Sequence, residues 1–286
     1  MNIIIDPHAG PCPGVERAIE MVEKHLDSER LTAIGPIIHN SVEVKRLEQK
    51  GLSTVEQDQV NDNRNLIQTN SVFIRSHGIS SDLRTKLKKC ADIIDGTCPK
   101  VTAIQKRIQS YYDKGYHIII TGKENHPEVE GLNGYCDGNA TIIKNESDIE
   151  SIPESEHYFL LSQTTFSQAR FLELKEAVLS KFPNTEYKDT TCTQVRKRHE
   201  TIHQFAATVD VLLLVGGKNS SNTRVLYNRA RQINPRTYWI ERFEEIDEIW
   251  LENSSTVGLT GSASTPVWQL LELQNKVSQL GLKKEE

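Results

Sequence analysis

The amino-acid sequence predicts an α/β protein of three similar domains, each built around a mostly parallel sheet. Two observations support this prediction. Short β-like runs alternate with helical patterns along the chain. Four landmarks also recur three times in the same order: a cysteine followed three residues later by valine, a polar motif ending a second strand, a third strand containing threonine, and a polar motif ending a fourth strand. We therefore expect domains at residues 1–90, 91–183 and 184–286.

In the first repeat, apolar residues at helical spacing predict a helix over residues 15–26. Asn40 and Ser41 are favourable N-cap residues for a short helix that ends before Gly51. The remaining elements are strands at residues 3–5, 31–38, 53–55 and 71–75 and a helix over 82–89, with a polar, acidic segment after the third strand.

The second and third repeats follow the same plan. In the second, we expect strands at residues 92–95, 116–121, 140–143 and 157–161 and helices over 101–111 and 167–182. In the third, we expect helices over 195–205 and 266–280 and strands at 210–216, 236–240 and 256–260. Gly281 favours the end of the last helix, so a charged tail is expected to follow it.

Composition narrows the class of protein. The net charge of −5, with scattered Lys and Arg, argues against nucleic-acid and anionic-membrane partners. No apolar run approaches the ~20 residues of a membrane span, and the N-terminus begins with a strand rather than a signal peptide. Five widely spaced cysteines are typical of a reducing compartment, where cysteines more often bind metals or catalyse reactions than form disulfides. We expect a cytoplasmic protein.

The polar motifs all fall at strand ends, where open α/β sheets bind their ligands. Three domains around a pseudo-threefold axis would turn these ends toward one centre and bring together Cys12, Cys98 and Cys192. Three thiolates suit a catalytic zinc with one bound water, or an iron–sulfur cluster with one free iron. A single cysteine at such a turn could equally be a small buried residue, but the threefold placement argues against that reading. Cys90 and Cys136 lie outside the pattern and are expected to be structural.

Three histidines also lie at predicted strand ends. One such histidine would be a capping or core residue, but His39, His77 and His126 together indicate an anion or metal pocket. The run from 219 to 223 and Ser264 could cradle a phosphate or simply cap helices. Because these donors are histidines and neutral groups rather than an arginine cluster, they favour a buried diphosphate on a small molecule.

One carboxylate belongs to the same set. Glu128 is a candidate proton donor, with a helix-dipole role as the alternative. Thr164, in Gln163-Thr-Thr165, could position a hydroxyl or a water.

Nearly the whole chain resembles the 4-hydroxy-3-methylbut-2-enyl diphosphate reductase family, an iron–sulfur enzyme family of the non-mevalonate isoprenoid pathway. The resemblance rests on Gly-Pro-Cys12-Pro-Gly-Val, His39-Asn, Ser76-His77-Gly, Gly96-Thr-Cys98-Pro-Lys-Val, Asn125-His-Pro-Glu-Val-Glu-Gly131, Ser162-Gln-Thr-Thr165, Gly217-Lys-Asn-Ser-Ser-Asn222 and Gly261-Ser-Ala-Ser264. It implies a three-domain α/β trefoil around a central [4Fe-4S] cluster, with the three repeated cysteines as ligands. An oxidised preparation could hold a [3Fe-4S] form instead.

The same resemblance implies a role for each site residue. Glu128 would deliver protons and Thr164 would orient the substrate hydroxyl, which binds the open iron. The implied diphosphate-binding residues are His39, His77, His126, Ser220, Ser221, Asn222 and Ser264. The implied reaction is a two-electron, two-proton reductive loss of the allylic hydroxyl as water, which yields isopentenyl and dimethylallyl diphosphate. No flavin or nicotinamide motif is visible, so a ferredoxin or flavodoxin is the implied electron donor.

The sequence departs from the family pattern near its cysteines. Pro11 replaces an aromatic residue, Gly96 replaces an alanine, and the run from 195 to 199 replaces a Thr- and Asn-rich segment ending in Arg-Gln, with Arg198 alone keeping its place. The last of these changes is expected to alter the hydrogen bonding around the third ligand, and none of the three removes a ligand. A cluster-dependent dehydratase and a non-catalytic zinc- or diphosphate-binding module are the competing hypotheses.

Overall fold

The structure is a computed structural model that describes residues 1–62, 67 and 69–282. The chain divides into two compact units. The first contains residues 1–19, 36–52 and 194–286, and the second contains residues 20–35 and 53–193. Part of the polar segment predicted after 53–55 and the predicted charged tail, at 63–66, 68 and 283–286, lie outside the described residues.

Three four-stranded sheets confirm the predicted α/β class. Sheet A, in the first unit, has the order β1 (Asn2–Ile5), β12 (Thr256–Gly261), β10 (Val211–Val215) and β11 (Thr237–Ile240). Sheet B, in the second unit apart from Leu52, has the order β3 (Leu52–Val55), β2 (Leu31–Ile34), β4 (Ser71–Ile74) and β5 (Asp92–Asp95). Sheet C, also in the second unit, has the order β7 (Thr141–Ile143), β6 (His117–Thr121), β8 (Tyr158–Ser162) and β9 (Glu186–Tyr187).

Nearly all neighbouring strands run parallel. Sheets A and C are parallel throughout, and so are the pairings of β2 with β4 and of β4 with β5 in sheet B. Parallel strands require crossover connections, which the helices between them supply. Their carboxyl ends therefore share one edge of each sheet, as the sequence analysis expected.

Each sheet takes an edge strand from the start of the following sequence repeat. Strand β5 opens the predicted second repeat but pairs with β4, and β9 pairs with β8. The N-terminal strand β1 pairs with β12, close to the other end of the chain. The boundaries at 90 and 183 stay a prediction about the sequence repeat, because strand pairing crosses them.

The helices connect the strands in the predicted alternation. Their bounds are α1 Pro13–Leu26, α2 Ser41–Gln49, α3 Gln57–Asp62, α4 Ser81–Leu87, α5 Pro99–Tyr112, α6 Pro127–Asn133, α7 Gln168–Lys181, α8 Thr193–Ala206, α9 Ser221–Ile233 and α10 Val267–Leu282. Short 3₁₀ helices cover Glu146–Ser151 (η2), Phe243–Glu245 (η3) and Glu248–Leu251 (η4). Among the described residues, no helix has the length and apolar character that crossing a membrane requires.

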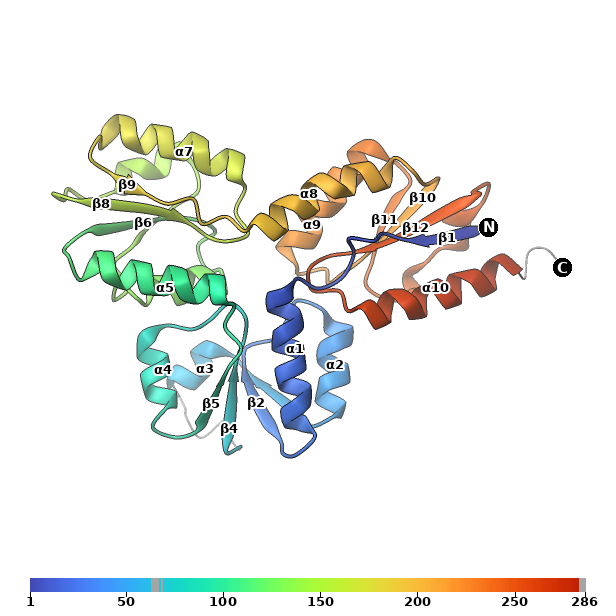
Figure 1. The fold of residues 1–286 in the computed structure, drawn as a ribbon, viewed down its shortest axis with the longest axis horizontal. Helices are drawn as coiled ribbons and strands as arrows, with labels where there is room; N and C mark the ends of the chain where they lie inside the picture. The colour runs from blue at the N-terminus through green and yellow to red at the C-terminus, as the bar shows by residue number, and fades with distance from the viewer. Residues whose placement is uncertain (63–66, 68, 283–286) are drawn as a thin grey trace. The chain divides into compact units, whose positions relative to one another are not determined.

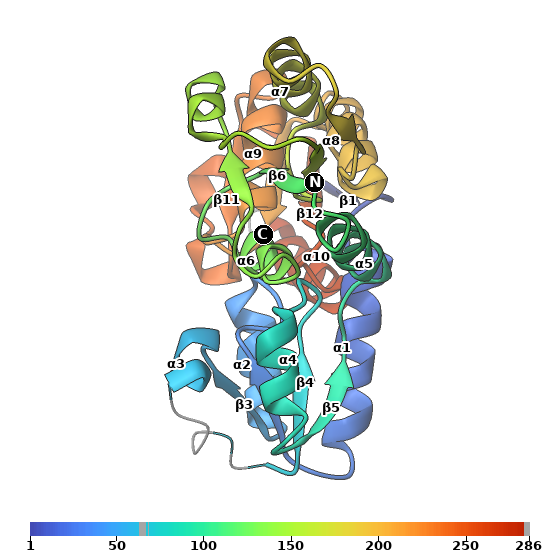
Figure 2. The same ribbon diagram turned by 90° about the vertical axis from the view of Figure 1, so that its left-hand side faces the viewer.

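Buried apolar residues join each sheet to its helices. Sheet C lies between α5 and α7 (Figure 1), with one core formed by residues such as Ile108 and Phe159 and another by Leu160 and Phe171. Sheet A has α8 and α9 on one face and α10 on the other (Figure 1). In sheet B, α4 packs against β4 (Figure 2), with Leu83 against the strand residues.

Several details differ from the sequence predictions. The strand predicted at 31–38 ends at Ile34, because Gly35 adopts a positive φ of 72° and proline follows it. Helix α10 continues through Gly281 to Leu282. Helix α3 and strand β9 were not predicted, and β9 has only two exposed residues and so no apolar pattern.

Candidate functional site

The carboxylate predicted as a proton donor is completely buried in the second unit. Glu128 lies in the first turn of α6 and is 1 % exposed. Both its oxygens accept hydrogen bonds from Thr164, whose backbone N–H donates to Oε1 over 2.6 Å and whose hydroxyl donates to Oε2 over 2.7 Å. Burial raises the pKa of Glu128 above its ordinary value, although the two hydrogen bonds from Thr164 oppose the shift. Thr164 therefore holds the carboxyl in one orientation, and burial makes it easier to protonate.

Thr164 also holds the backbone of a predicted cysteine ligand. Its carbonyl oxygen accepts a hydrogen bond from the N–H of Cys192 over 2.7 Å. Ser76 repeats this arrangement in sheet B, where its carbonyl accepts from the N–H of Cys98 over 3.0 Å. In both places, the loop after one strand fixes the cysteine loop after the neighbouring edge strand. The exchanged edge strands β5 and β9 therefore place the two thiols beside the polar ends of β4 and β8.

The two histidines of the second unit lie in contact. The rings of His77 and His126 are 5.5 Å apart at their centroids and meet edge to face at 87°. His126 is also the N-cap of α6, and its Nδ1 accepts from the N–H of Glu128 over 3.1 Å. Donation to Nδ1 leaves Nε2 as the nitrogen that carries a proton in the neutral ring. The structure thus brings together both histidines, Glu128 and Thr164.

A lysine contacts the third predicted ligand. Lys100 lies in the first turn of α5, and its Nζ is 3.5 Å from Sγ of Cys192 and 3.0 Å from the hydroxyl of Thr193. The contact places a positive charge beside the sulfur of this cysteine. The sequence analysis gave no role to Lys100, because its contact crosses 92 residues of chain.

In the first unit, His39 and the other predicted phosphate-binding loops meet. The hydroxyl of Ser264 donates to the carbonyl oxygen of His39 over 3.4 Å. Gly217 lies so close that a Cβ at this position would be 2.2 Å from the same oxygen, so only glycine fits there. Asn40 caps α2 and donates to Oε1 of Gln269 over 2.9 Å, which joins the His39 loop to α10. Gln269 was not predicted, because only the tertiary structure brings it near Asn40.

The predicted Ser-Ser-Asn run begins helix α9. Ser220 is the N-cap, and its hydroxyl oxygen accepts from the N–H of Thr223 over 3.2 Å. Ser221 and Asn222 occupy the first two helical positions, where backbone N–H groups and the helix dipole favour an anion. Oδ1 of Asn222 lies 3.2 Å from Nε2 of His199 on α8. This arrangement is compatible with both the capping alternative and the phosphate hypothesis, because one hydroxyl can cap α9 while the neighbouring groups bind a phosphate.

The five cysteines fall into two groups. All five lie among the described residues, and none of them forms a disulfide there. Cys12, Cys98 and Cys192 are half-buried and directly precede α1, α5 and α8. Cys136 is buried and donates to the carbonyl of Asn133 over 3.2 Å, and burial raises its pKa to about 12. The thiol of Cys90 bonds to carbonyls at the carboxyl end of α4. The three cysteines of the first group therefore share one place in the fold, at the start of a helix, and the other two do not.

A buried ion pair anchors α8 to sheet A. Arg198 donates to Oδ2 of Asp6 over 2.7 Å, to the hydroxyl of Thr260, and to the carbonyl oxygen of Gly261 over 3.0 Å. Asp6 follows β1 and therefore lies on the loop that leads to Cys12. This network holds the carboxyl ends of β1 and β12 together beneath the site loops of the first unit.

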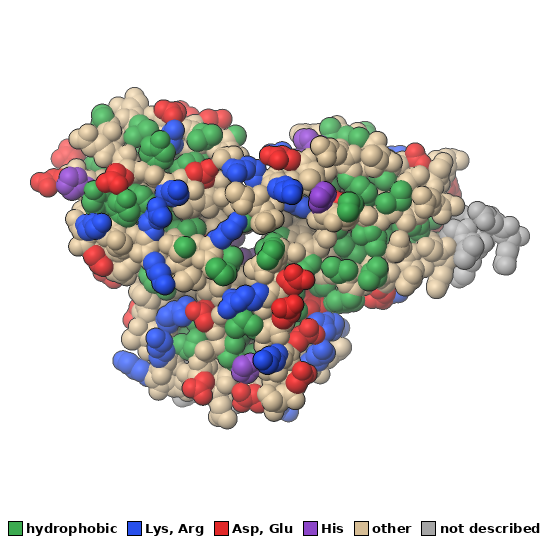
Figure 3. All heavy atoms as spheres, in the orientation of Figure 1, with side chains coloured by type: hydrophobic (Ala, Val, Ile, Leu, Met, Phe, Trp, Pro, Cys, Tyr) green, Lys and Arg blue, Asp and Glu red, His purple; other side chains and the backbone are tan. Residues whose placement is uncertain are grey.

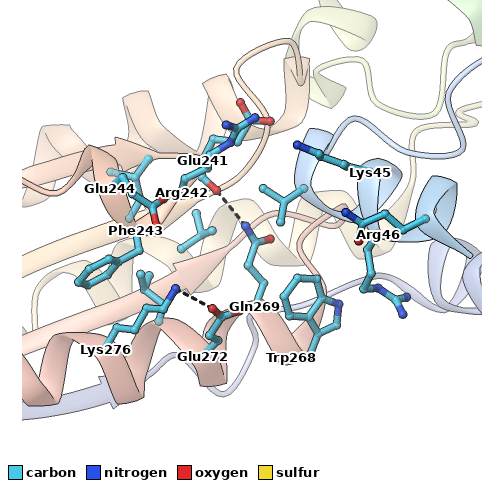
Figure 4. A pocket seen from close by; sticks show the side chains of 15 residues that line it. Lys45, Arg46, Glu241, Arg242, Phe243, Glu244, Trp268, Gln269, Glu272 and Lys276 are labelled. Carbon is cyan, nitrogen blue, oxygen red and sulfur yellow. Dashed lines mark hydrogen bonds and ion pairs between the residues drawn. The ribbon is translucent and has the colours of Figure 1, made fainter.

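A separate cavity of about 510 Å³ lies at the ends of β10 and β11 (Figure 4). Val215 and Ile240 line it together with the side chain of Trp268. Gln269 points into it from α10 and donates to the carbonyl of Glu241 over 2.9 Å (Figure 4). None of the predicted site residues lines this cavity, so we do not assign it to the predicted chemistry.

The predicted residues therefore form two groups. The first unit holds Cys12, His39, Ser220, Ser221, Asn222 and Ser264, and the second holds His77, Cys98, His126, Glu128, Thr164 and Cys192. Parallel sheets that present a buried carboxyl, histidines and half-buried cysteines at their strand ends are typical of an enzyme.

Comparison with known proteins agrees with that class. Residues 3–278 match the LytB protein family, so the chain belongs to this family. It is 39 % identical over 284 residues to the 4-hydroxy-3-methylbut-2-enyl diphosphate reductase of Caldanaerobacter subterraneus subsp. tengcongensis, covering 98 % of each chain. The enzyme of the same name from Aquifex aeolicus is 34 % identical over 286 residues, covering 98 % of this chain and 97 % of the other.

Solved structures give the same result. The chain is similar to (E)-4-hydroxy-3-methyl-but-2-enyl diphosphate reductase, described as the terminal enzyme of the non-mevalonate pathway. The TM-score is 0.75 and the identity 33 %, and the similarity covers 98 % of this chain and 100 % of that one. The E-1-hydroxy-2-methyl-but-2-enyl-4-diphosphate reductase of Plasmodium falciparum gives a TM-score of 0.82 at 28 % identity, with coverages of 96 % and 87 %. The predicted family resemblance is confirmed, and the chain is an oxidoreductase.

Proposed function

We propose that the chain reduces (E)-4-hydroxy-3-methylbut-2-enyl diphosphate to isopentenyl and dimethylallyl diphosphate, with two electrons, two protons and release of water. The relatives named for this activity support the proposal. The observation that carries it is the arrangement of Glu128, Thr164 and Cys192: a buried carboxyl is hydrogen-bonded to a threonine whose carbonyl binds the backbone of a predicted cluster ligand. Hydrogen bonds through Thr164 thereby connect the proposed proton donor to a proposed cysteine ligand of the cluster.

The donor set fits an iron–sulfur cluster. Cys12, Cys98 and Cys192 are half-buried and each directly precedes a helix, whereas the thiols of Cys90 and Cys136 donate to backbone carbonyls. We propose the first three as thiolate ligands of a [4Fe-4S] cluster around which the three repeats are arranged. When bound, such a cluster supplies the electrons and an iron with an open coordination position.

Glu128 and Thr164 are proposed to move the proton to the leaving hydroxyl. Because the backbone N–H of Thr164 donates to Oε1, a proton on the carboxyl belongs on Oε2. The Thr164 hydroxyl donates to Oε2 in the structure. When Oε2 carries the proton, this hydrogen bond would reverse, and the hydroxyl would accept from Oε2 and donate its own proton outward. The buried position raises the pKa of the carboxyl, which suits a group that gives its proton to the allylic hydroxyl.

The remaining predicted residues are proposed to bind the diphosphate. Histidine N–H groups, hydroxyls and the N-terminus of α9 supply hydrogen-bond donors for its oxygens. The proposed binding residues are His39, His77, His126, Ser220, Ser221, Asn222 and Ser264. Their donors hold the anionic end of the substrate, so the allylic hydroxyl is oriented by contacts remote from the bond that breaks.

The proposed electron donor is a ferredoxin or a flavodoxin. Helix α5, which follows Cys98, carries Lys100, Lys106 and Arg107 and no acidic residue. Lys and Arg side chains lie on the visible face in the region of this helix (Figure 3). Such a surface would attract an acidic redox protein. A cytoplasmic location remains a prediction.

Anaerobic turnover tests the proposal. The purified protein, reconstituted with iron and sulfide, should convert the hydroxylated diphosphate to the two products only when a reductant is supplied. Full-rate turnover without reductant would favour the dehydratase hypothesis. A colourless protein that retains zinc and no iron or sulfide would contradict the cluster.

A further inference from the structure

We propose that His199 is a positioning residue. It holds the side-chain amide of Asn222 so that the NH2 group of that amide faces the substrate diphosphate. This inference rests on the proposed function, because it assigns how one proposed diphosphate-binding residue is oriented. His199 is new to the site: it lies within the run after Cys192 that departs from the family pattern, and the sequence analysis gave it no role.

Only one of these two side chains can donate the hydrogen bond between them. Nε2 of His199, on α8, lies 3.2 Å from Oδ1 of Asn222, at the second position of α9. The amide oxygen carries no hydrogen, so the ring nitrogen donates and the amide accepts. With its oxygen held by the imidazole, the amide directs both N–H bonds away from α8.

The environment of the imidazole supports this direction. Burial is the largest influence on the pKa of His199 and lowers it, although the hydrogen bond to Asn222 opposes the shift. The ring is therefore neutral near pH 7 and carries a single N–H. The contact with Asn222 assigns that hydrogen to Nε2.

Orientation matters because an amide has two unlike ends. An NH2 group that faces a diphosphate donates a hydrogen bond, whereas the oxygen would repel the anion. Without His199, Asn222 can rotate and present either end. The expected loss is the benefit of one aligned hydrogen bond in substrate binding, while the proton delivery at Glu128 is unaffected.

Three variants of His199 and one control test the proposal in the reconstituted holoprotein. His199→Phe and His199→Leu remove the donor and differ in volume, whereas His199→Gln retains a terminal N–H donor. His203→Phe is the matched control, since His203 lies one turn further along α8 and its Nε2 has no hydrogen-bond partner among the described residues.

Steady-state kinetics with excess reductant should separate binding from chemistry. In His199→Phe and His199→Leu, KM for the hydroxylated diphosphate should rise about 3- to 10-fold, the value of about one hydrogen bond. The inhibition constant of inorganic pyrophosphate should rise with it. The kcat, the iron and sulfide content and the melting temperature should stay near wild type. His199→Gln and His203→Phe should keep the wild-type KM.

A double-mutant cycle provides the decisive comparison. Asn222→Ala should raise KM more than either His199 variant, and adding His199→Leu to it should change KM no further. A wild-type KM in both donor-less variants, or fully multiplicative effects in the double mutant, would overturn the inference. If the wild-type protein shows no reductant-dependent turnover, the proposed function fails instead, and the inference fails with it.

Discussion

Thr164 occupies both carboxylate oxygens of Glu128, with its backbone N–H on Oε1 and its hydroxyl on Oε2. Among the described residues, only Thr164 forms a hydrogen bond with this carboxyl. The orientation of the proposed proton donor is therefore set by a single neighbour, which also holds the backbone of Cys192.

Replacing Glu128 by glutamine should abolish most turnover. The amide keeps the size of the side chain but has no acidic proton, so a loss of about 100-fold or more in kcat is expected. Binding of inorganic pyrophosphate and the iron and sulfide content should stay unchanged. Turnover near the wild-type rate, measured anaerobically with excess reductant, would show that the proton comes from elsewhere.

The same carboxyl should make stability depend on pH. Burial raises the pKa of Glu128 in the folded state, so the folded protein binds an extra proton between the ordinary and the raised pKa. Its contribution to stability is complete below the ordinary pKa and is lost as pH rises through the folded pKa. Urea unfolding between about pH 5 and 8 should therefore show Glu128→Gln gaining stability relative to wild type as pH rises. A pH-independent difference between the two proteins would contradict this assignment.

Substituting Cys98 by serine should remove the whole cluster. Two remaining thiolates cannot hold a stable cluster, so iron, sulfide and the visible absorption should all be lost after reconstitution. Cys90→Ser and Cys136→Ser are the controls and should keep the metal content, because these thiols bond to backbone carbonyls. Full metal content in Cys98→Ser would exclude it as a ligand.

Lys100 should tune the proposed cluster. Its ammonium group is 3.5 Å from Sγ of Cys192, and a nearby positive charge favours the more negative, reduced cluster. Lys100→Met should therefore lower the midpoint potential, measured by redox titration of the visible or electron paramagnetic resonance signal. Lys106→Met removes the same charge from the same helix and should shift the potential less. Equal shifts in both variants would mean that only net charge matters.

The Asp6–Arg198 pair should be important for folding. Both side chains are buried, so Arg198→Met leaves an uncompensated aspartate and should lower the free energy of unfolding by about 3–5 kcal/mol. The double variant with Asp6→Asn should recover part of that loss. Arg170→Met, in an exposed ion pair with Glu173, should have almost no effect. Urea unfolding checks all three, and an Arg198→Met protein as stable as wild type would exclude a structural role for the pair.

The sequence predicted secondary-structure elements and motifs better than it predicted which side chains contact one another. The period of apolar residues and the capping ability of Asn40 are local properties, and α2 begins where they indicated. The contact between Glu128 and Thr164 depends instead on the pairing of two parallel strands, which no local pattern encodes. Lys100 and His199 were missed for the same reason, because their partners lie 92 and 23 residues away along the chain.

The pairing of β1 with β12 has a consequence for the order in which the protein folds. The ribosome makes β1 long before β12, which is its sheet partner among the described strands and lies at residues 256–261. Sheets B and C can close during synthesis, whereas residues 2–5 must wait until nearly the entire chain has emerged. Cys12, which follows β1, therefore reaches its final position after Cys98 and Cys192 have theirs. Insertion of a cluster held by all three would be a step that follows synthesis and does not accompany it.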